Sequence, residues 1–298
     1  MLPGHARYEP SAIPARPVYD WPDGKRLAFY IGMNIEVFGF LAGLGPDPVT
    51  GSGPQTHRNY AWRDYGNRVG IWNLFDLFDE FALPASCIVN AWLYDHYPEI
   101  FDRIRARGDA IVGHGRTNAE RQSGLWEEDE RRLIAEATDT IERNEGARPA
   151  GWLGPGSVET AVTPDLLKEA GYRYCLDWPC DDQPIWLNTR SGKLLSVPYP
   201  FELNDIGQIV FRRHTAREFA DMIVDQFEAM VRQCVHRPLV FSVSLHSFIA
   251  GQPFRTTALR RAFEHIREHE LRDRVWFTHS DAIAEHCYGL DPAKLPGG

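Results

Sequence analysis

Polar residues stand directly after several apolar runs of the sequence, where buried strands are expected to end. Carboxylates and imidazoles are the side chains that move protons or hold metal ions near neutral pH. If the runs are parallel strands, their carboxyl ends share one rim, and residues distant in sequence meet there. The four residues in question are Asn34, Glu36, His114 and His246.

Glu36 and Asn34 lie two positions apart, which places both side chains on one side of an extended strand. We interpret Glu36 as a general base or a metal ligand, with an ion pair to an arginine as the alternative. For Asn34, contact with a substrate and the satisfaction of backbone groups in a turn fit the sequence about equally.

His114 and Asn118 stand four positions apart, a spacing that aligns two side chains on one helical turn. They could flank one ligand, or mark a helix start at a Gly-rich turn. An amide oxygen binds zinc less well than an imidazole does, so a Glu36–His114–Asn118 set would hold metal weakly. His246 is either a general acid or a buried core histidine.

Arginine, aromatic and acidic residues complete the candidate site. Arg148 and Trp152, in a segment made rigid by Pro149, are expected to hold an anion and to wall a pocket. We expect Glu36, His114, Arg148 and His246 to surround one cavity. Asp181 and Asp182 could orient a catalytic group, and Asp182 could contact substrate, or both could be solvated. The aromatic residues expected to enclose a ligand are Phe38, Phe40, Trp62, Tyr65 and Trp152.

Apolar periodicity predicts strands alternating with helices, which implies parallel strands and favours an α/β barrel of seven or eight strands. The predicted strands are 26–33, 86–91, 109–113, 151–153, 172–176, 194–198, 239–245 and 275–278. The predicted helices are 69–81, 97–106, 126–144, 164–170, 216–233 and 257–268.

We expect one catalytic domain over residues 27–290, preceded by an extended arm (1–26) and followed by a tail (291–298). Pro17 and Trp21 could anchor the arm on the domain. Residues 41–60 are dense in glycine and proline, which predicts a long loop over the end of the first strand.

Composition excludes several classes of function. A formal net charge of −9 opposes binding of nucleic acid. The apolar runs are too short to span a membrane, and the first residues lack a signal-peptide core, so we expect a cytoplasmic protein. Five cysteines without CxxC spacing fit neither a disulfide framework nor a zinc knuckle. Without a GxSxG, Walker or dinucleotide motif, we expect no serine hydrolase and no nucleotide cofactor.

The motifs together resemble the polysaccharide-deacetylase superfamily, which is carbohydrate esterase family 4 with the NodB-homology fold. The similarity runs from about Arg16 to Tyr288 and is greatest with the branch of peptidoglycan-deacetylase-like proteins, cyclic imidases and allantoinases. Its motifs are the segments 16–24, 65–70, 114–117, 148–152, 198–199, 204–205, 246 and 251–255.

This resemblance implies a distorted (β/α) barrel that hydrolyses carbon–nitrogen bonds other than peptide bonds. It places Glu36 at the metal-binding aspartate of the family, and His114 and Asn118 at its two histidine ligands. His246 falls at the catalytic acid, Asn34 at the position of the base, and Asn204 in the substrate site. Two amides therefore replace a base and a ligand.

From these residues we expect hydrolysis of a small linear or cyclic amide or imide, with Glu36 activating water, Arg148 or a metal stabilising the oxyanion, and His246 protonating the leaving nitrogen. A metal-dependent sugar N-deacetylase and a non-catalytic ligand-binding protein are the alternatives. The sequence is compatible with one bound divalent metal of the zinc type as a cofactor. The extended N-terminal arm is compatible with a homo-oligomer, but the sequence does not determine the oligomeric state.

Overall fold

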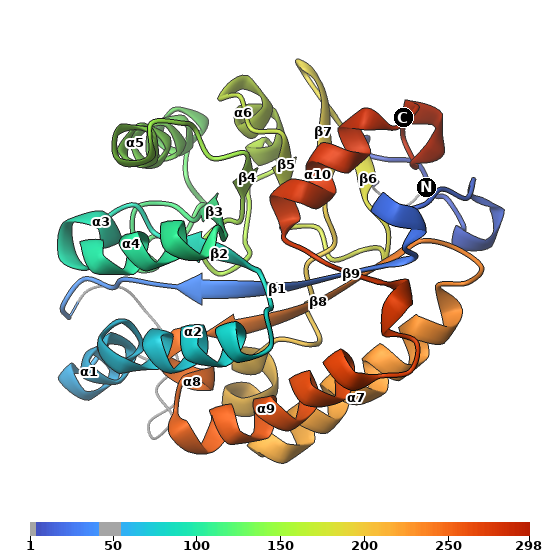
Figure 1. The fold of residues 1–298 in the computed structure, drawn as a ribbon. Coiled ribbons are helices and arrows are strands. Elements are labelled where there is room, and N and C mark those ends of the chain that lie inside the picture. Colours follow the sequence, from blue (N-terminus) through green and yellow to red (C-terminus); the bar gives the residue numbers. More distant parts are fainter. Residues whose placement is uncertain (1–3, 42–54) are drawn as a thin grey trace.

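A computed structural model describes residues 4–41 and 55–298, and the statements below concern these residues. One sheet of nine strands runs through the described chain in the order β6-β7-β5-β4-β3-β2-β1-β8, with β9 added to β1 (Figure 1). The strands are β1 (Leu27–Ile35), β2 (Ala85–Val89), β3 (Ala110–Gly113), β4 (Gly151–Trp152), β5 (Tyr174–Cys175), β6 (Ile185–Thr189), β7 (Gly192–Ser196), β8 (Leu239–His246) and β9 (Val275–Phe277).

Helices surround the sheet, as Figure 1 shows, with α2, α7 and α9 on one side of the curled sheet and α3 to α6 on another. They are α1 (His57–Tyr65), α2 (Ile71–Glu80), α3 (Leu93–His96), α4 (Pro98–Arg107), α5 (Glu127–Glu145), α6 (Thr163–Glu169), α7 (Ala216–Gln233), α8 (Ser247–Ala250), α9 (Pro253–Glu268) and α10 (Ser280–Gly289). Short turns are η1 (Ile13–Ala15), η2 (Pro22–Gly24), η5 (Arg272–Arg274) and η6 (Pro292–Lys294), and η3 (Gly66–Gly70) and η4 (Ile206–Phe211) are π-helical. No helix in this part of the chain has the length and apolar composition needed to cross a bilayer.

The central strand β1 is buried along its whole length, and its alternating side chains enter two different cores. Phe29 and Ile31 pack in the layer between the sheet and helices α2, α7 and α9. Ala28 and Tyr30 point the opposite way, into the interior of the curled sheet. Asn34 continues this interior-facing series. β1 therefore delivers a polar side chain to the carboxyl end of the barrel interior.

The barrel is distorted because strands β6 and β8 at the two edges do not pair with each other. Chain segments bridge the gap instead: the Val240 amide donates to the Asp182 carbonyl at 2.8 Å, and the Ser244 amide donates to the Leu203 carbonyl at 2.9 Å. The predicted fold class, a distorted and mostly parallel α/β barrel, is confirmed. The exception to parallel pairing is the β6–β7 hairpin.

The N-terminal arm packs on the barrel through polar anchors. Trp21 is buried and donates its indole N–H to the Leu239 carbonyl at 3.1 Å. Arg16 binds Asp181 through two hydrogen bonds, with oxygens at 2.6 and 2.7 Å. Pro17 is exposed, so its predicted anchoring role is wrong.

The predicted loop and two elements of the fold differ from the prediction. Of the predicted loop 41–60, residues 42–54 lie outside the described residues, while α1 begins at His57 inside it. Thr56 caps this helix by accepting the Asn59 amide at 3.1 Å. α10 and the strand β6 were not predicted.

Four of the five cysteines are buried and all five are free, as their spacing predicts.

Candidate active site

A cavity of about 340 Å³ opens at the carboxyl ends of the strands, where parallel α/β barrels place their active sites. β1, β3 and β8 deliver Glu36, His114 and His246 to it. Its walls also include the aromatic side chains Phe38, Phe201, Phe211 and Phe248. The other residues that line it are Asn34, Arg63, Asn118, Arg121, Leu153, Gly156, Ser157, Tyr199, Asn204, Ile206, Gly207, Gln208 and Arg212.

His246 is held by a buried carboxylate. Its Nδ1 lies 2.6 Å from Oδ1 of Asp205, and its backbone amide donates to Oδ2 of the same residue at 2.8 Å. Burial lowers the pKa of His246, but the negative charges of Asp205 and Glu36 outweigh burial and raise it above its ordinary value. With Nδ1–H bound to Asp205, Nε2 is the nitrogen free to exchange a proton in the cavity.

Glu36 lies between the two histidines. Its Oε1 is 3.5 Å from Nε2 of His114 and 3.7 Å from Nε2 of His246. Burial raises the pKa of Glu36, but His246, His114 and Arg63 together outweigh it and leave the pKa below its ordinary value. Glu36 is therefore a carboxylate at neutral pH, although its side chain is only 3% exposed.

Three buried polar atoms of this cluster have no hydrogen-bond partner among residues 4–41 and 55–298: Oε2 of Glu36, Nε2 of His114 and Oδ1 of Asn118. His114 donates Nδ1–H to the Leu153 carbonyl at 2.6 Å, which leaves the lone pair of Nε2 directed at the cavity in the neutral ring. Buried groups without partners are rare and call for a ligand, a water or an ion. A carboxylate, an imidazole and an amide oxygen with free lone pairs fit a divalent cation, and the amide makes the set weaker than one with two histidines.

Asn34 is fixed by the interior of the barrel. Its side-chain amide donates to the Tyr199 hydroxyl at 2.8 Å, and to Oγ of Ser244 and the Leu245 carbonyl at 3.1 Å each. The Tyr199 ring occupies the space in front of Gly32, where an added Cβ would come within 2.6 Å of it. Asn34 thus lines the cavity with a side-chain amide that is fixed by hydrogen bonds. An amide is not basic, so Asn34 cannot act as a general base.

Several predicted site residues lie elsewhere. Arg148 is on the surface, with its side chain 53% exposed and paired with Glu142 at 3.0 Å, so the prediction that it joins the cavity is wrong. It precedes β4, which places it at the amino end of the strand, away from the catalytic rim. Trp152 is fully buried in a core cluster and donates its indole N–H to Gln122 at 3.0 Å.

Asp182 and three other predicted aromatic residues also lie outside the lining of this cavity. Asp182 is exposed and lines a second cavity together with Asp181, which is bound to Arg16. Tyr65 is not part of the described lining of the catalytic cavity, Trp62 packs behind it on Phe248, and Phe40 is 63% exposed. Phe38 and Asn204 do line the cavity, as predicted.

The sequence reasoning gave no role to Asp205 or to Arg63. Asp205 is fully buried beside His246, and its only sequence signal was its place in the 204–205 motif. Arg63 comes from α1, a helix that the sequence pattern does not predict. Its guanidinium stacks over the Phe38 ring at 3.8 Å, and its charge affects the pKa values of both Glu36 and His246.

Comparisons with known proteins agree with this geometry. Residues 60–175 match the family model described as polysaccharide deacetylase. A putative polysaccharide deacetylase of Schizosaccharomyces pombe is 25% identical over 289 residues, covering 91% of this chain and 88% of the relative. The chain is therefore similar to polysaccharide deacetylases in a central segment and, at lower identity, along most of its length.

Two solved structures of similar shape cover nearly the whole chain. The Puue allantoinase has a TM-score of 0.79 at 27% identity, over 91% of this chain and 93% of that one. A probable polysaccharide deacetylase from Pseudomonas aeruginosa PAO1 has a TM-score of 0.79 at 25% identity, over 91% and 94%. The structures similar to this chain thus include an allantoinase and a probable polysaccharide deacetylase.

Proposed function

We propose that this protein hydrolyses a small linear or cyclic amide or imide in the cavity at the carboxyl end of its barrel. The observation that carries the proposal is the facing pair of Glu36 and His246, with a buried aspartate behind the histidine. Opposed pKa shifts hold one group as a carboxylate and favour the protonated form of the other, which are the states required of a base and an acid.

In the proposed reaction Glu36 accepts a proton from water as the water oxygen bonds to the carbonyl carbon. His246 then donates its Nε2 proton to the nitrogen as the carbon–nitrogen bond breaks. An amide gives a carboxylic acid and an amine. An imide gives a carboxylic acid and an amide, which stay in one molecule when the imide is cyclic. Asp205 stabilises the protonated ring and fixes its orientation. Atoms balance with water as the only co-substrate.

Arg63 takes the place that we had expected Arg148 to fill. Its buried guanidinium lines the cavity close to Glu36 and His246, where it can stabilise negative charge that develops on the carbonyl oxygen. Asn118 presents an unpartnered Oδ1 that can accept an N–H of an amide or imide.

The residues that would hold a divalent metal are Glu36, His114 and Asn118. Such an ion would polarise a carbonyl or lower the pKa of water as a Lewis acid. With His114 braced by Leu153 through Nδ1, the ring keeps its position with or without an ion.

The size and lining of the cavity support a small substrate. A volume of about 340 Å³ lies at the lower end of the range for ligand pockets, roughly 300–1,000 Å³. Phe38, Phe201, Phe211 and Phe248 form apolar walls suited to a compact ring or short chain. A polymer would need an open groove beyond these walls.

The test is a substrate panel of linear amides, cyclic imides, ureides and N-acetylglucosamine oligomers, assayed with and without a chelator. We expect turnover of a small amide, imide or ureide, and loss of this turnover in His246→Ala. Near-full activity of His246→Ala would remove the acid from the mechanism. Turnover of the oligomers alone, abolished by the chelator, would identify a metal-dependent sugar N-deacetylase instead.

A further inference from the structure

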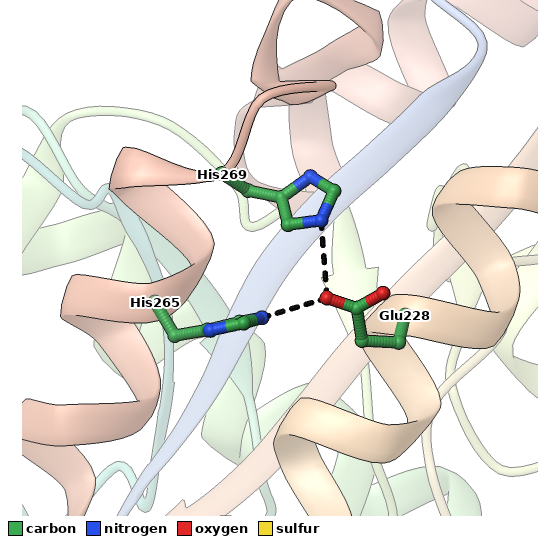
Figure 2. Close-up of side chains that lie close together, drawn as sticks. All are labelled: Glu228, His265 and His269. Carbon is green, nitrogen blue, oxygen red and sulfur yellow. Dashed lines mark hydrogen bonds and ion pairs between the residues drawn. The ribbon is translucent and has the colours of Figure 1, made fainter.

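Two histidines and a glutamate converge between helices α7 and α9, away from the catalytic cavity (Figure 2). Glu228 comes from α7, His265 from the last turn of α9, and His269 directly follows that helix. One ligand atom from each lies within 4.8 Å of the others. None of the three lines the catalytic cavity.

The position of the cluster in the fold separates it from the active site. His269 precedes β9, which pairs with Leu27 to Phe29 at the start of β1, whereas Glu36 follows the end of β1. The cluster therefore lies toward the amino ends of the strands. In α/β barrels this end contributes to stability, whereas the carboxyl end carries the active site.

Both imidazoles are directed at one carboxylate oxygen. Nε2 of His265 lies 2.8 Å, and Nε2 of His269 lies 3.0 Å, from Oε1 of Glu228, as Figure 2 shows. His269 is nearly buried, with its side chain 9% exposed, and packs edge-on against Phe227 at 5.2 Å. His265 is more accessible, at 39% exposure, which leaves a path for an ion.

The arrangement matches the requirements of a transition-metal site. His265 in the last turn of α9 and His269 just beyond the helix bring two ring nitrogens to one place, and a carboxylate supplies negative charge. Zinc binds such ligands at about 2.0–2.2 Å in tetrahedral geometry, so neighbouring ligand atoms stand about 3.3 Å apart. The two nitrogen–oxygen separations here would need to open by only about 0.3–0.5 Å.

We propose that Glu228, His265 and His269 form a second, structural site for a divalent transition metal of the zinc class. The ion would join α7 to α9 across their packed faces and stabilise the folded chain. Water or a solvent ligand would complete the coordination on the exposed side of His265.

Ion binding has a definite cost at this site. Nδ1 of His269 accepts the Leu271 amide at 3.0 Å, so the neutral ring carries its proton on Nε2. Coordination through Nε2 transfers that proton to Nδ1 and breaks the Leu271 bond. Oε2 of Glu228 keeps its ion pair with Arg232. We therefore expect moderate affinity.

The experiment is calorimetric titration with Zn²⁺ of a Glu36→Gln/His114→Asn chain, which removes binding at the catalytic cavity. We expect one equivalent of zinc to bind and the Tm to rise by several degrees at saturating zinc. Adding His265→Asn should weaken this binding about tenfold or more, since even residues that only orient a ligand contribute that much.

His236→Asn is the matched control, because His236 is an exposed histidine just beyond α7 and outside the cluster. Unchanged zinc binding in His236→Asn together with loss in His265→Asn supports the site. No bound zinc, or equal binding in the two variants, would overturn it. If the double background variant does not fold, the equivalents lost from the wild-type chain on His265→Asn give the same answer.

Discussion

The pairing of His246 with Asp205 leads to a prediction with a measurable size. Asp205→Asn keeps the shape of the side chain but removes the charge that accepts Nδ1–H of His246 at 2.6 Å. A hydrogen bond to a charged group contributes about 1.5–3 kcal/mol. At 1.36 kcal/mol per pKa unit, its loss should lower the pKa of His246 by about 1–2 units.

The sign of the effect follows from the raised pKa of His246 in the folded protein. The stabilisation of the protonated ring is fully present below the unfolded pKa and is lost as pH rises through the folded pKa. In Asp205→Asn the alkaline limb of kcat/KM should therefore move down by about 1–2 pH units. Above this limb the rate should fall by about 10–100-fold.

The measurement is an NMR titration of the His246 ring, assigned with His246→Ala, together with pH–rate profiles on the best amide substrate. Asp221→Asn, an exposed carboxylate change on α7, serves as the control and should leave both unchanged. A His246 pKa in Asp205→Asn equal to or above the wild-type value would refute the reasoning.

Three further predictions concern other parts of the account. Arg148→Ala should leave kcat/KM within about twofold of wild type, because the Arg148 side chain is exposed. Arg63→Ala should lower kcat/KM by at least about tenfold. Steady-state kinetics measure both, and a larger loss in Arg148→Ala than in Arg63→Ala would contradict the account. Gly251→Ala should destabilise the fold by about 1–3 kcal/mol in urea unfolding, since an added Cβ would lie 2.4 Å from Gly70, whereas Gly289→Ala, with open space, should have little effect; equal midpoints would show that the close approach of Gly251 to Gly70 has no energetic weight. Asn118→His should raise zinc affinity at the catalytic cavity by about tenfold or more in calorimetry, and no change would mean that residue 118 is not a ligand.

The barrel could be predicted from the sequence because its strands are short apolar runs with polar residues at their ends. β1 and β8 show this pattern most clearly, and they deliver Glu36 and His246 to the cavity. β6 was missed because its apolar part, Ile185 to Leu187, is too brief to stand out before the turn at Ser191. α1 was missed because its mostly polar residues show no apolar stripe.

The errors in the candidate site have specific physical causes. Arg148 was assigned to the rim although it precedes its strand, and the carboxyl-end rule itself would have excluded it. The side chains of Trp152 and Leu153 point to opposite faces of the sheet. Both are apolar and buried, so the sequence does not indicate which of them faces the cavity. Asp205 directly precedes the π-helical turn η4 between β7 and α7, and the sequence pattern did not predict this turn.

The central claim, that Glu36 directs water onto a carbon–nitrogen bond, is tested most directly in ¹⁸O-labelled water. The panel substrates are incubated with the wild-type protein and with Glu36→Gln, and the masses of the products are measured by mass spectrometry. With wild type we expect one ¹⁸O atom in the new carboxyl group, formed at a rate at least about a hundredfold above that of Glu36→Gln. Product without the label, or equal rates for the two proteins, would contradict the account.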